Sequence, residues 1–170
     1  MRSALKTIEA WWGRNTRPIS LGDRAPRAKL QRAGGEGSFD LGEPGEHVLL
    51  TFLLGDWCPL CHIVMRHYMQ WADELTAHGV KVVGVVPSAE VFSDALDPRF
   101  ELLSDPECRV TRSFTNIELG DEAGRRSALP ESFLIDRAGV VRWGSALGRA
   151  RTGFAPEVLR IAEHAWAPRR

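Results

Sequence analysis

Two cysteines separated by two residues follow a long apolar run, and this juxtaposition limits the possible fold more than any other feature of the chain. Residues 48–54 are almost entirely apolar and read as a buried strand. The segment Cys58-Pro59-Leu60-Cys61 follows shortly after them, and a helical pattern of apolar residues continues from it. We therefore expect a strand that ends before the two cysteines and a helix that begins at them, which places Cys58 at a helix N-terminus.

This placement predicts a reactive thiol at Cys58. Unpaired backbone N–H groups and the helix dipole stabilise a thiolate at a helix N-terminus. Cys58 is therefore the expected nucleophile, and Cys61 is the thiol that attacks a mixed disulfide formed on Cys58. Trp57 is expected to be an apolar shield beside Cys58. Asp56 and His62 are the candidate groups for proton transfer in this segment.

Charge and composition narrow the class of protein. The 170 residues carry 22 basic and 22 acidic side chains, so the formal net charge is zero. This balance argues against a nucleic-acid partner and against a polybasic membrane binder. No run is long and apolar enough to span a bilayer. Charges at Lys6 and Glu9 interrupt the apolar stretch that a signal peptide needs, so we expect a cytoplasmic protein without a membrane partner.

In a reducing cytosol, a lone Cys-x-x-Cys is more often catalytic or metal-binding than structural. Zinc held by Cys58, Cys61 and a histidine is one alternative, although the chain has no second Cys-x-x-Cys and His62 directly follows Cys61. The pattern from Cys58 to His62 also fits attachment of c-type haem, but that reaction needs an exported chain. Cys108 reads as a small, partly buried residue, with a third redox cysteine as the alternative.

The other expected elements alternate along the chain. Residues 1–20 are expected to form an N-terminal amphipathic helix and a connection, and residues 21–170 are expected to form the main domain. The helix is expected to pack on this domain, and the alternative is that it docks a partner or a membrane surface through Trp11 and Trp12. Further strands are expected at residues 28–31, 38–41, 80–86, 100–103, 132–135 and 140–143. Helices are expected at residues 59–78, 89–96, 106–114 and 156–166, and a loop at residues 120–127.

The order of these elements predicts the fold class. A helix that joins two apolar strands is a βαβ unit, and strands that are apolar throughout fit a sheet with both faces covered. Residues 132–143 read as a hairpin. We expect an α/β sandwich with a mixed central sheet covered by helices on both faces.

Four segments carry a family resemblance. They resemble motifs of the thioredoxin-like redoxins and occur in the same order as in that family, at residues 22–26, 52–61, 102–107 and 129–139. The chain most resembles the peroxiredoxin-like branch of the alkyl hydroperoxide reductase/thiol-specific antioxidant family. The resemblance implies a thioredoxin-like sandwich. It also implies that Pro130 is a cis-proline that presents the backbone of Leu129 to a disulfide beside Cys58; the alternative is an ordinary trans proline at the start of a strand.

The chain departs from this family at three positions. Typical peroxiredoxins have a threonine where this chain has Gly55 and an arginine where it has Pro130, and these groups help to position the peroxide. The position of the buried acid of thioredoxin is occupied by Phe52 in this chain. The proton acceptor for Cys61 is therefore expected elsewhere, in water, His62 or Asp56.

The predicted function is that of a thiol–disulfide oxidoreductase in which Cys58 attacks and Cys61 resolves. The substrate is expected to be a protein or small-molecule disulfide, or a peroxide, and a cellular dithiol is expected to regenerate the reduced form. No bound cofactor or metal is expected, because the cysteines hold the redox equivalents. Pro59 is compatible with a more oxidising dithiol than that of thioredoxin. A peroxiredoxin-type thiol peroxidase, a redoxin-fold binding protein and a metal-binding module remain as alternatives.

Overall fold

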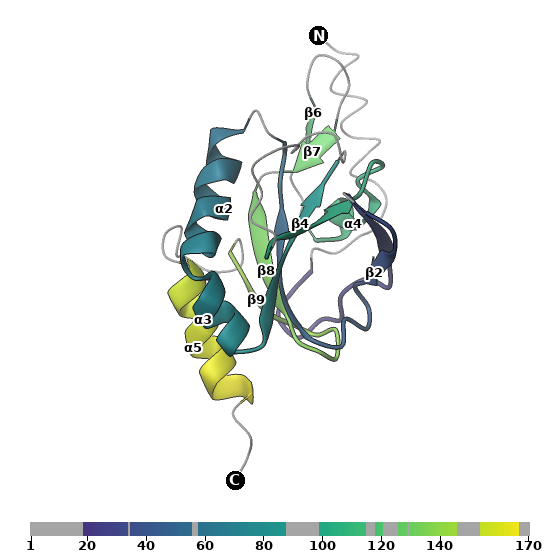
Figure 1. The fold of residues 1–170 in the computed structure, drawn as a ribbon. Helices are drawn as coiled ribbons and strands as arrows, with labels where there is room; N and C mark the ends of the chain where they lie inside the picture. The colour runs from purple at the N-terminus through teal and green to yellow at the C-terminus, as the bar shows by residue number, and fades with distance from the viewer. Residues whose placement is uncertain are drawn as a thin grey trace.

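Seven strands form one mixed sheet in the order β2-β1-β5-β4-β3-β8-β9 (Figure 1). The computed structural model describes residues 19–33, 35–55, 58–87, 99–114, 118–120, 126–128, 130–145 and 154–166. The strands of this sheet are β1 (Lys29–Arg32), β2 (Ser38–Asp40), β3 (His47–Phe52), β4 (Val80–Val86), β5 (Glu101–Ser104), β8 (Glu131–Ile135) and β9 (Val141–Gly144). The neighbours β3, β4 and β5 run parallel, whereas β8 is antiparallel to β3.

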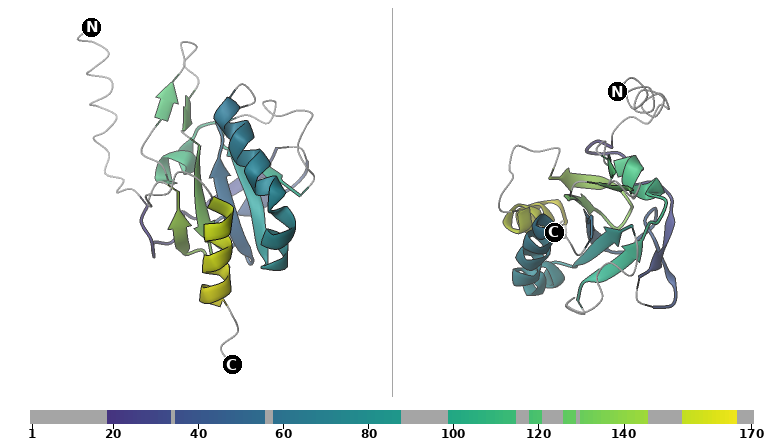
Figure 2. Two further views of the ribbon diagram at one scale, coloured as in Figure 1. Left: turned by 90° about the vertical axis from the view of Figure 1, so that its left-hand side faces the viewer. Right: turned by 90° about the horizontal axis from the view of Figure 1, so that it is seen from above.

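Helices cover both faces of the sheet, as predicted. The described helices are α2 (Pro59–Gln70), α3 (Ala72–Ala77), α4 (Arg109–Phe114) and α5 (Phe154–Trp166). In Figures 1 and 2, α2, α3 and α5 lie together on one face, and α4 lies on the other. Every residue of β3 is buried, because alternate side chains enter two different cores. Leu49 joins the core beneath α2 and α5, whereas Val48 and Leu50 join the core that contains α4.

The predicted helix at residues 59–78 is in fact two helices. It breaks at Trp71, whose backbone angles (φ −110°, ψ 10°) leave the helical region. The N–H group of Trp71 bonds to the carbonyl of Tyr68 at 3.1 Å, which tightens the last turn of α2. After α3, Gly79 adopts φ +69°, the conformation in which a glycine commonly ends a helix.

Two other boundaries differ from the prediction. The helix expected from Pro106 begins at Arg109, because residues 106–108 form a turn in which Cys108 has φ +50°. Asp105 caps this helix by accepting hydrogen bonds from the N–H groups of Arg109 and Thr111. The predicted loop at 120–127 is also wrong at both ends, because β6 (Glu118–Gly120) and β7 (Arg126–Ala128) pair as an antiparallel ribbon.

Backbone hydrogen bonds join the segment before β1 to the hairpin of β8 and β9. Gly22 donates a backbone hydrogen bond to Val141, and Ala25 donates one to Gly139. The predicted N-terminal helix that includes Trp11 and Trp12 and the predicted helix at residues 89–96 lie outside the described residues. In the part of the chain that is described, no helix is long and apolar enough to cross a membrane.

Candidate active site

Cys58 caps the N-terminus of α2, as the sequence predicts. Its backbone is extended (φ −93°, ψ 105°), and its sulfur accepts a hydrogen bond from the N–H group of Cys61 at 3.2 Å. The chain reaches this position from β3 through residues 53–55, and the N–H group of Cys58 bonds to the carbonyl of Gly55 at 3.1 Å. The cap residue therefore holds its thiol over the first turn of the helix.

Gly55 accounts for one departure from the peroxiredoxin pattern. Its φ of +151° lies in a region that residues with a side chain rarely adopt. A threonine at this position would strain the backbone that leads to Cys58. The backbone at position 55 therefore favours a glycine.

The two sulfurs of the dithiol are 2.6 Å apart, and the Cys61 thiol donates to the Cys58 sulfur. Both cysteines are free in this structure, since a disulfide bond would hold the sulfurs at about 2.05 Å. Cys61 is completely buried, and the N–H group of Leu54 donates to its sulfur at 3.3 Å. This geometry needs only a small movement to close the Cys58–Cys61 bond.

Burial keeps the thiol of Cys61 protonated. Loss of solvation, followed by the hydrogen bond to Cys58, raises the pKa of the Cys61 thiol to about 12. At neutral pH Cys61 is thus a donor, and Cys58 Sγ accepts hydrogen bonds from both the thiol and the backbone N–H of Cys61. The two cysteines therefore differ in their hydrogen bonding, and the attacking and resolving roles stay a prediction.

The other predicted site residues fall into two groups. Pro59 is the first residue of α2 and is exposed, and the side chain of His62 is also exposed, one turn further along. Asp56, Trp57 and Leu129 lie outside the described residues. Pro130 is described, but the bond before it belongs to Leu129, so its cis conformation stays a prediction.

Glu131 is a partly buried acidic residue on the face of Phe52 and Phe133, opposite to the core that holds the two cysteines, and the sequence reasoning gave it no role. It pairs with Phe52 across the β3–β8 ladder, so it lies opposite the last residue before the chain turns towards the dithiol. Burial raises the pKa of its carboxyl above the ordinary value. The one signal in the sequence is an acidic residue directly before the apolar run of β8.

A cluster of buried hydroxyl groups lies between α2 and the sheet. The side chains of Thr51 and Ser132 approach each other to 3.1 Å. Burial raises the pKa of Tyr68, and the hydroxyls of Thr51 and Ser132 partly oppose that shift, although no hydrogen bond of ordinary geometry reaches its phenol oxygen. This neutral cluster gives the site no charged group.

Apolar side chains are exposed beside the dithiol. Leu60 and Ile63 have 50% and 64% of their surface exposed, although both are large apolar residues in the first turns of α2. By contrast, Cys108 is buried in the turn before α4. Within the described ranges, no three His, Cys, Asp or Glu side chains come together as a metal site would require.

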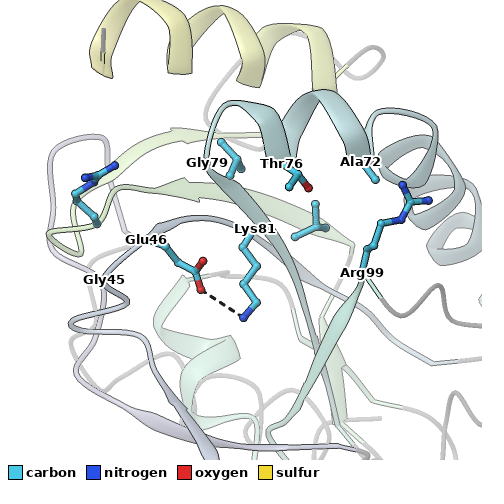
Figure 3. Close-up of a pocket in the computed structure, with 10 residues that line it drawn as sticks. Gly45, Glu46, Ala72, Thr76, Gly79, Lys81 and Arg99 are labelled. Carbon is cyan, nitrogen blue, oxygen red and sulfur yellow. Dashed lines mark ion pairs between the residues drawn. The ribbon is translucent and has the colours of Figure 1, made fainter. Parts of the chain in front are cut away.

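A cavity of about 360 Å³ lies at the other end of the sheet (Figure 3). Its walls come from the residues before β3, from α3 and from the start of β4, and they include Lys81 and Arg99. Lys81 pairs with Glu46 at 3.3 Å and with Glu101 at 2.6 Å, and Arg99 pairs with Asp73 at 2.6 Å. This cavity is separate from the dithiol, and these two cations are already paired.

Comparisons with known proteins agree with the geometry. The profile of the AhpC/TSA family matches residues 21–144, which include the dithiol. The thiol:disulfide interchange protein DsbE of Vibrio cholerae is 29% identical over 136 residues, which are 74% of this chain and 64% of that protein. The chain thus matches less than two thirds of that relative's length.

Solved structures show the same fold at low sequence identity. Peroxiredoxin 5 from Alvinella pompejana has a TM-score of 0.69 at 21% identity, with 84% of this chain and 99% of that chain covered. Peroxidoxin BcpB from Mycobacterium tuberculosis has a TM-score of 0.70 at 20% identity, with 85% and 97% covered. The thioredoxin-like sandwich predicted from the sequence is therefore confirmed.

Proposed function

The chain belongs to the AhpC/TSA family, and we propose that within it this protein is a thiol–disulfide oxidoreductase that uses Cys58 and Cys61. The observation that carries the proposal is the geometry of the dithiol. Cys58 is at a helix N-terminus, and the protonated Cys61 lies 2.6 Å from its sulfur. This arrangement suits an attacking thiol and a resolving thiol.

The reaction begins with the thiolate of Cys58. It attacks one sulfur of a disulfide substrate, forms a mixed disulfide and releases the other half of the substrate as a thiolate. Cys61 then loses its proton and attacks the Cys58 sulfur, which releases the second half of the substrate. The substrate gains two electrons, and the protein is left with a Cys58–Cys61 disulfide. A cellular dithiol is the proposed donor that restores the reduced form.

Thiol peroxidase activity is the second candidate, because it uses the same two cysteines and the fold is that of solved peroxiredoxins. Here the Cys58 thiolate would attack the peroxide and break its O–O bond, releasing an alcohol or water and becoming a sulfenic acid. Cys61 would then attack the Cys58 sulfur, releasing water and forming the same disulfide. The chain has Gly55 and Pro130 where peroxide-positioning groups are expected. We therefore propose that disulfides react faster than peroxides.

Stopped-flow fluorescence of the reduced protein separates these functions. Trp143 is buried in the same core cluster as both cysteines and gives an intrinsic signal. Mixed with glutathione disulfide or with hydrogen peroxide at equal concentrations, the protein should react faster with the disulfide. Cys58→Ser should abolish the reaction, and Cys61→Ser should stop it at the mixed disulfide.

The matched control is Cys108→Ser, which removes a buried thiol outside the dithiol and should leave both rates unchanged. A faster reaction with peroxide would favour the peroxidase. No reaction with either reagent would contradict both redox functions and leave the binding and metal-binding alternatives.

A further inference from the structure

The outer face of α2 begins directly beside the dithiol. The inner face of this helix is formed by its buried residues, Cys61, Val64, Met65 and Tyr68. On the opposite face, Pro59, Ile63 and Arg66 follow one another at intervals of four and three residues, so they lie in one row along the helix. Figure 1 shows α2 on the outside of the molecule. A molecule whose sulfur is bound to Cys58 therefore lies next to this row.

Two large apolar side chains of this face are open to solvent. Leu60 and Ile63 have 50% and 64% of their surface exposed, and among the described residues the only other large apolar side chain that is similarly exposed is Leu21, which precedes β1. A single exposed apolar residue needs no explanation, whereas neighbouring ones mark a contact surface. Leu60 and Ile63 are one turn apart in the helix that starts at the reactive thiol.

Arg66 is an exposed cation on the same face, and it makes no ion pair or hydrogen bond with another described residue. The other arginines whose side chains the structure describes each have an interaction, such as the pair of Arg32 with Glu101. No residue of α2 is acidic. The surface beside the dithiol thus combines an apolar part with a positive charge that is open to an anionic partner.

The spacing of these groups fits a bound peptide. Arg66 follows Cys58 by eight residues, which is about 12 Å along the helix axis. Helical side chains lean towards the N-terminus, so the guanidinium lies nearer to the dithiol than its backbone does. An extended peptide rises about 3.3 Å per residue, so about three residues span the distance from Cys58 to this guanidinium. Such a peptide passes Ile63 on the way.

We propose that the preferred substrate is a polypeptide disulfide in which apolar residues flank the cysteine and an acidic side chain lies about three residues away from it. The inference rests on the proposed function and adds which disulfides the site selects. Leu60 and Ile63 contact the apolar side chains, and Arg66 pairs with the carboxylate. A small disulfide bound at Cys58 does not extend to Arg66 and gains neither contact.

The chemistry of the reaction is unchanged by this selection. The Cys58 thiolate attacks one sulfur of the peptide disulfide, and the other peptide leaves as a thiolate. Cys61 then loses its proton and attacks Cys58, which releases the first peptide as the second thiolate. Two electrons pass from the dithiol to the substrate. The contacts with α2 act before and during the first of these steps, so they change the rate of attack by Cys58.

Two matched peptide disulfides test the pairing with Arg66. Each is the symmetrical disulfide of a short capped peptide with a central cysteine and apolar neighbours, and the peptides differ only in glutamate or glutamine at the third position on both sides. In stopped-flow fluorescence the reduced protein should react about three- to fivefold faster with the glutamate peptide at low salt, the range of an exposed ion pair. High salt should reduce this preference. Arg66→Gln should remove it and leave the rate with the glutamine peptide unchanged.

The apolar contact is tested separately. Ile63→Ser should slow the reaction with both peptides about threefold, because part of an apolar side chain is no longer covered. Its rate with the small neutral disulfide of mercaptoethanol should stay at the wild-type value, which shows that the dithiol is intact. Lys29→Gln is the matched control for charge, since Lys29 is an exposed cation on β1, which β5 and β4 separate from β3. It should keep the full preference for glutamate.

The outcomes separate this inference from the proposed function. Equal rates with the two peptides in the wild type, or a preference for glutamate that survives in Arg66→Gln, would overturn the selection by charge. Unchanged peptide rates in Ile63→Ser would overturn the apolar contact. Each of these results leaves the proposed function intact as long as the mercaptoethanol disulfide is reduced. Failure of the wild type to reduce that disulfide and both peptides would overturn the function and the inference together.

Discussion

At the scale of single residues, the fold makes two identical side chains chemically different. Cys58 is the cap of α2 and accepts hydrogen bonds, whereas Cys61 is completely buried and donates one. The spacing of the cysteines predicts this division, because only the first of them can cap the helix. The partly buried position of Glu131 was not predictable in the same way, since it depends on the pairing of β8 with β3, far apart in the sequence.

Alkylation tests the difference between the two thiols. Burial and the hydrogen bond to Cys58 raise the pKa of Cys61 to about 12, so little of its thiolate is present at pH 8. Iodoacetamide at pH 8 should therefore label Cys58 and leave Cys61 unmodified, and Cys61 should also resist labelling in Cys58→Ser. Peptide mass spectrometry measures both sites. Equal labelling of the two cysteines would refute the assignment of roles.

At the scale of elements, the sequence predicted those strands and turns whose structure depends on neighbouring residues alone. The hairpin of β8 and β9 was predicted from its turn, and Asp136 supports that turn by accepting hydrogen bonds from the N–H groups of Ala138 and Val140. The break at Trp71 and the late start of α4 were not predicted, because they depend on a terminal hydrogen bond and on the positive φ of Cys108.

Gly139 in this turn is required by a close contact as well as by its backbone. It has φ +78°, and a Cβ there would lie 2.4 Å from the carbonyl oxygen of Gly42. Gly139→Ala should lower the free energy of unfolding by about 2 kcal/mol or more. Gly45→Ala is the control, because Gly45 has φ +74° but nothing within 4 Å, so only the backbone strain of about 1 kcal/mol should appear. Urea unfolding measures both; equal losses would show that the contact with Gly42 is unimportant.

At the scale of the whole molecule, the sheet brings together residues that the sequence separates. The apolar runs of β3 and β4, the helical pattern between them and the hairpin of β8 and β9 predicted an α/β sandwich, and the family resemblance implied that it is thioredoxin-like. The ribbon of β6 and β7 was missed, because its short polar strands carry no alternating pattern. The cytoplasmic location stays a prediction.

The stability of the molecule should depend on pH through Glu131. Its pKa is raised in the folded protein, so its stabilising contribution is complete below the unfolded pKa and is lost as pH rises through the folded pKa. Glu131→Gln should therefore match the wild-type melting temperature near pH 4 and exceed it at pH 7, by at most about 3 °C because the group is only partly buried. Thermal unfolding monitored by circular dichroism measures this; a lower melting temperature of the variant at pH 7 would show that the ionised carboxylate has a stabilising partner.

The most direct test of the account is to trap its intermediate. Cys61→Ser is incubated with glutathione disulfide, and the site of any glutathione adduct is determined by intact-mass and peptide mass spectrometry. The account predicts one glutathione, attached to Cys58, and its absence from the wild type, in which Cys61 releases it. An adduct at Cys108, or no adduct at all, would contradict the assignment of Cys58 as the nucleophile of a thiol–disulfide oxidoreductase.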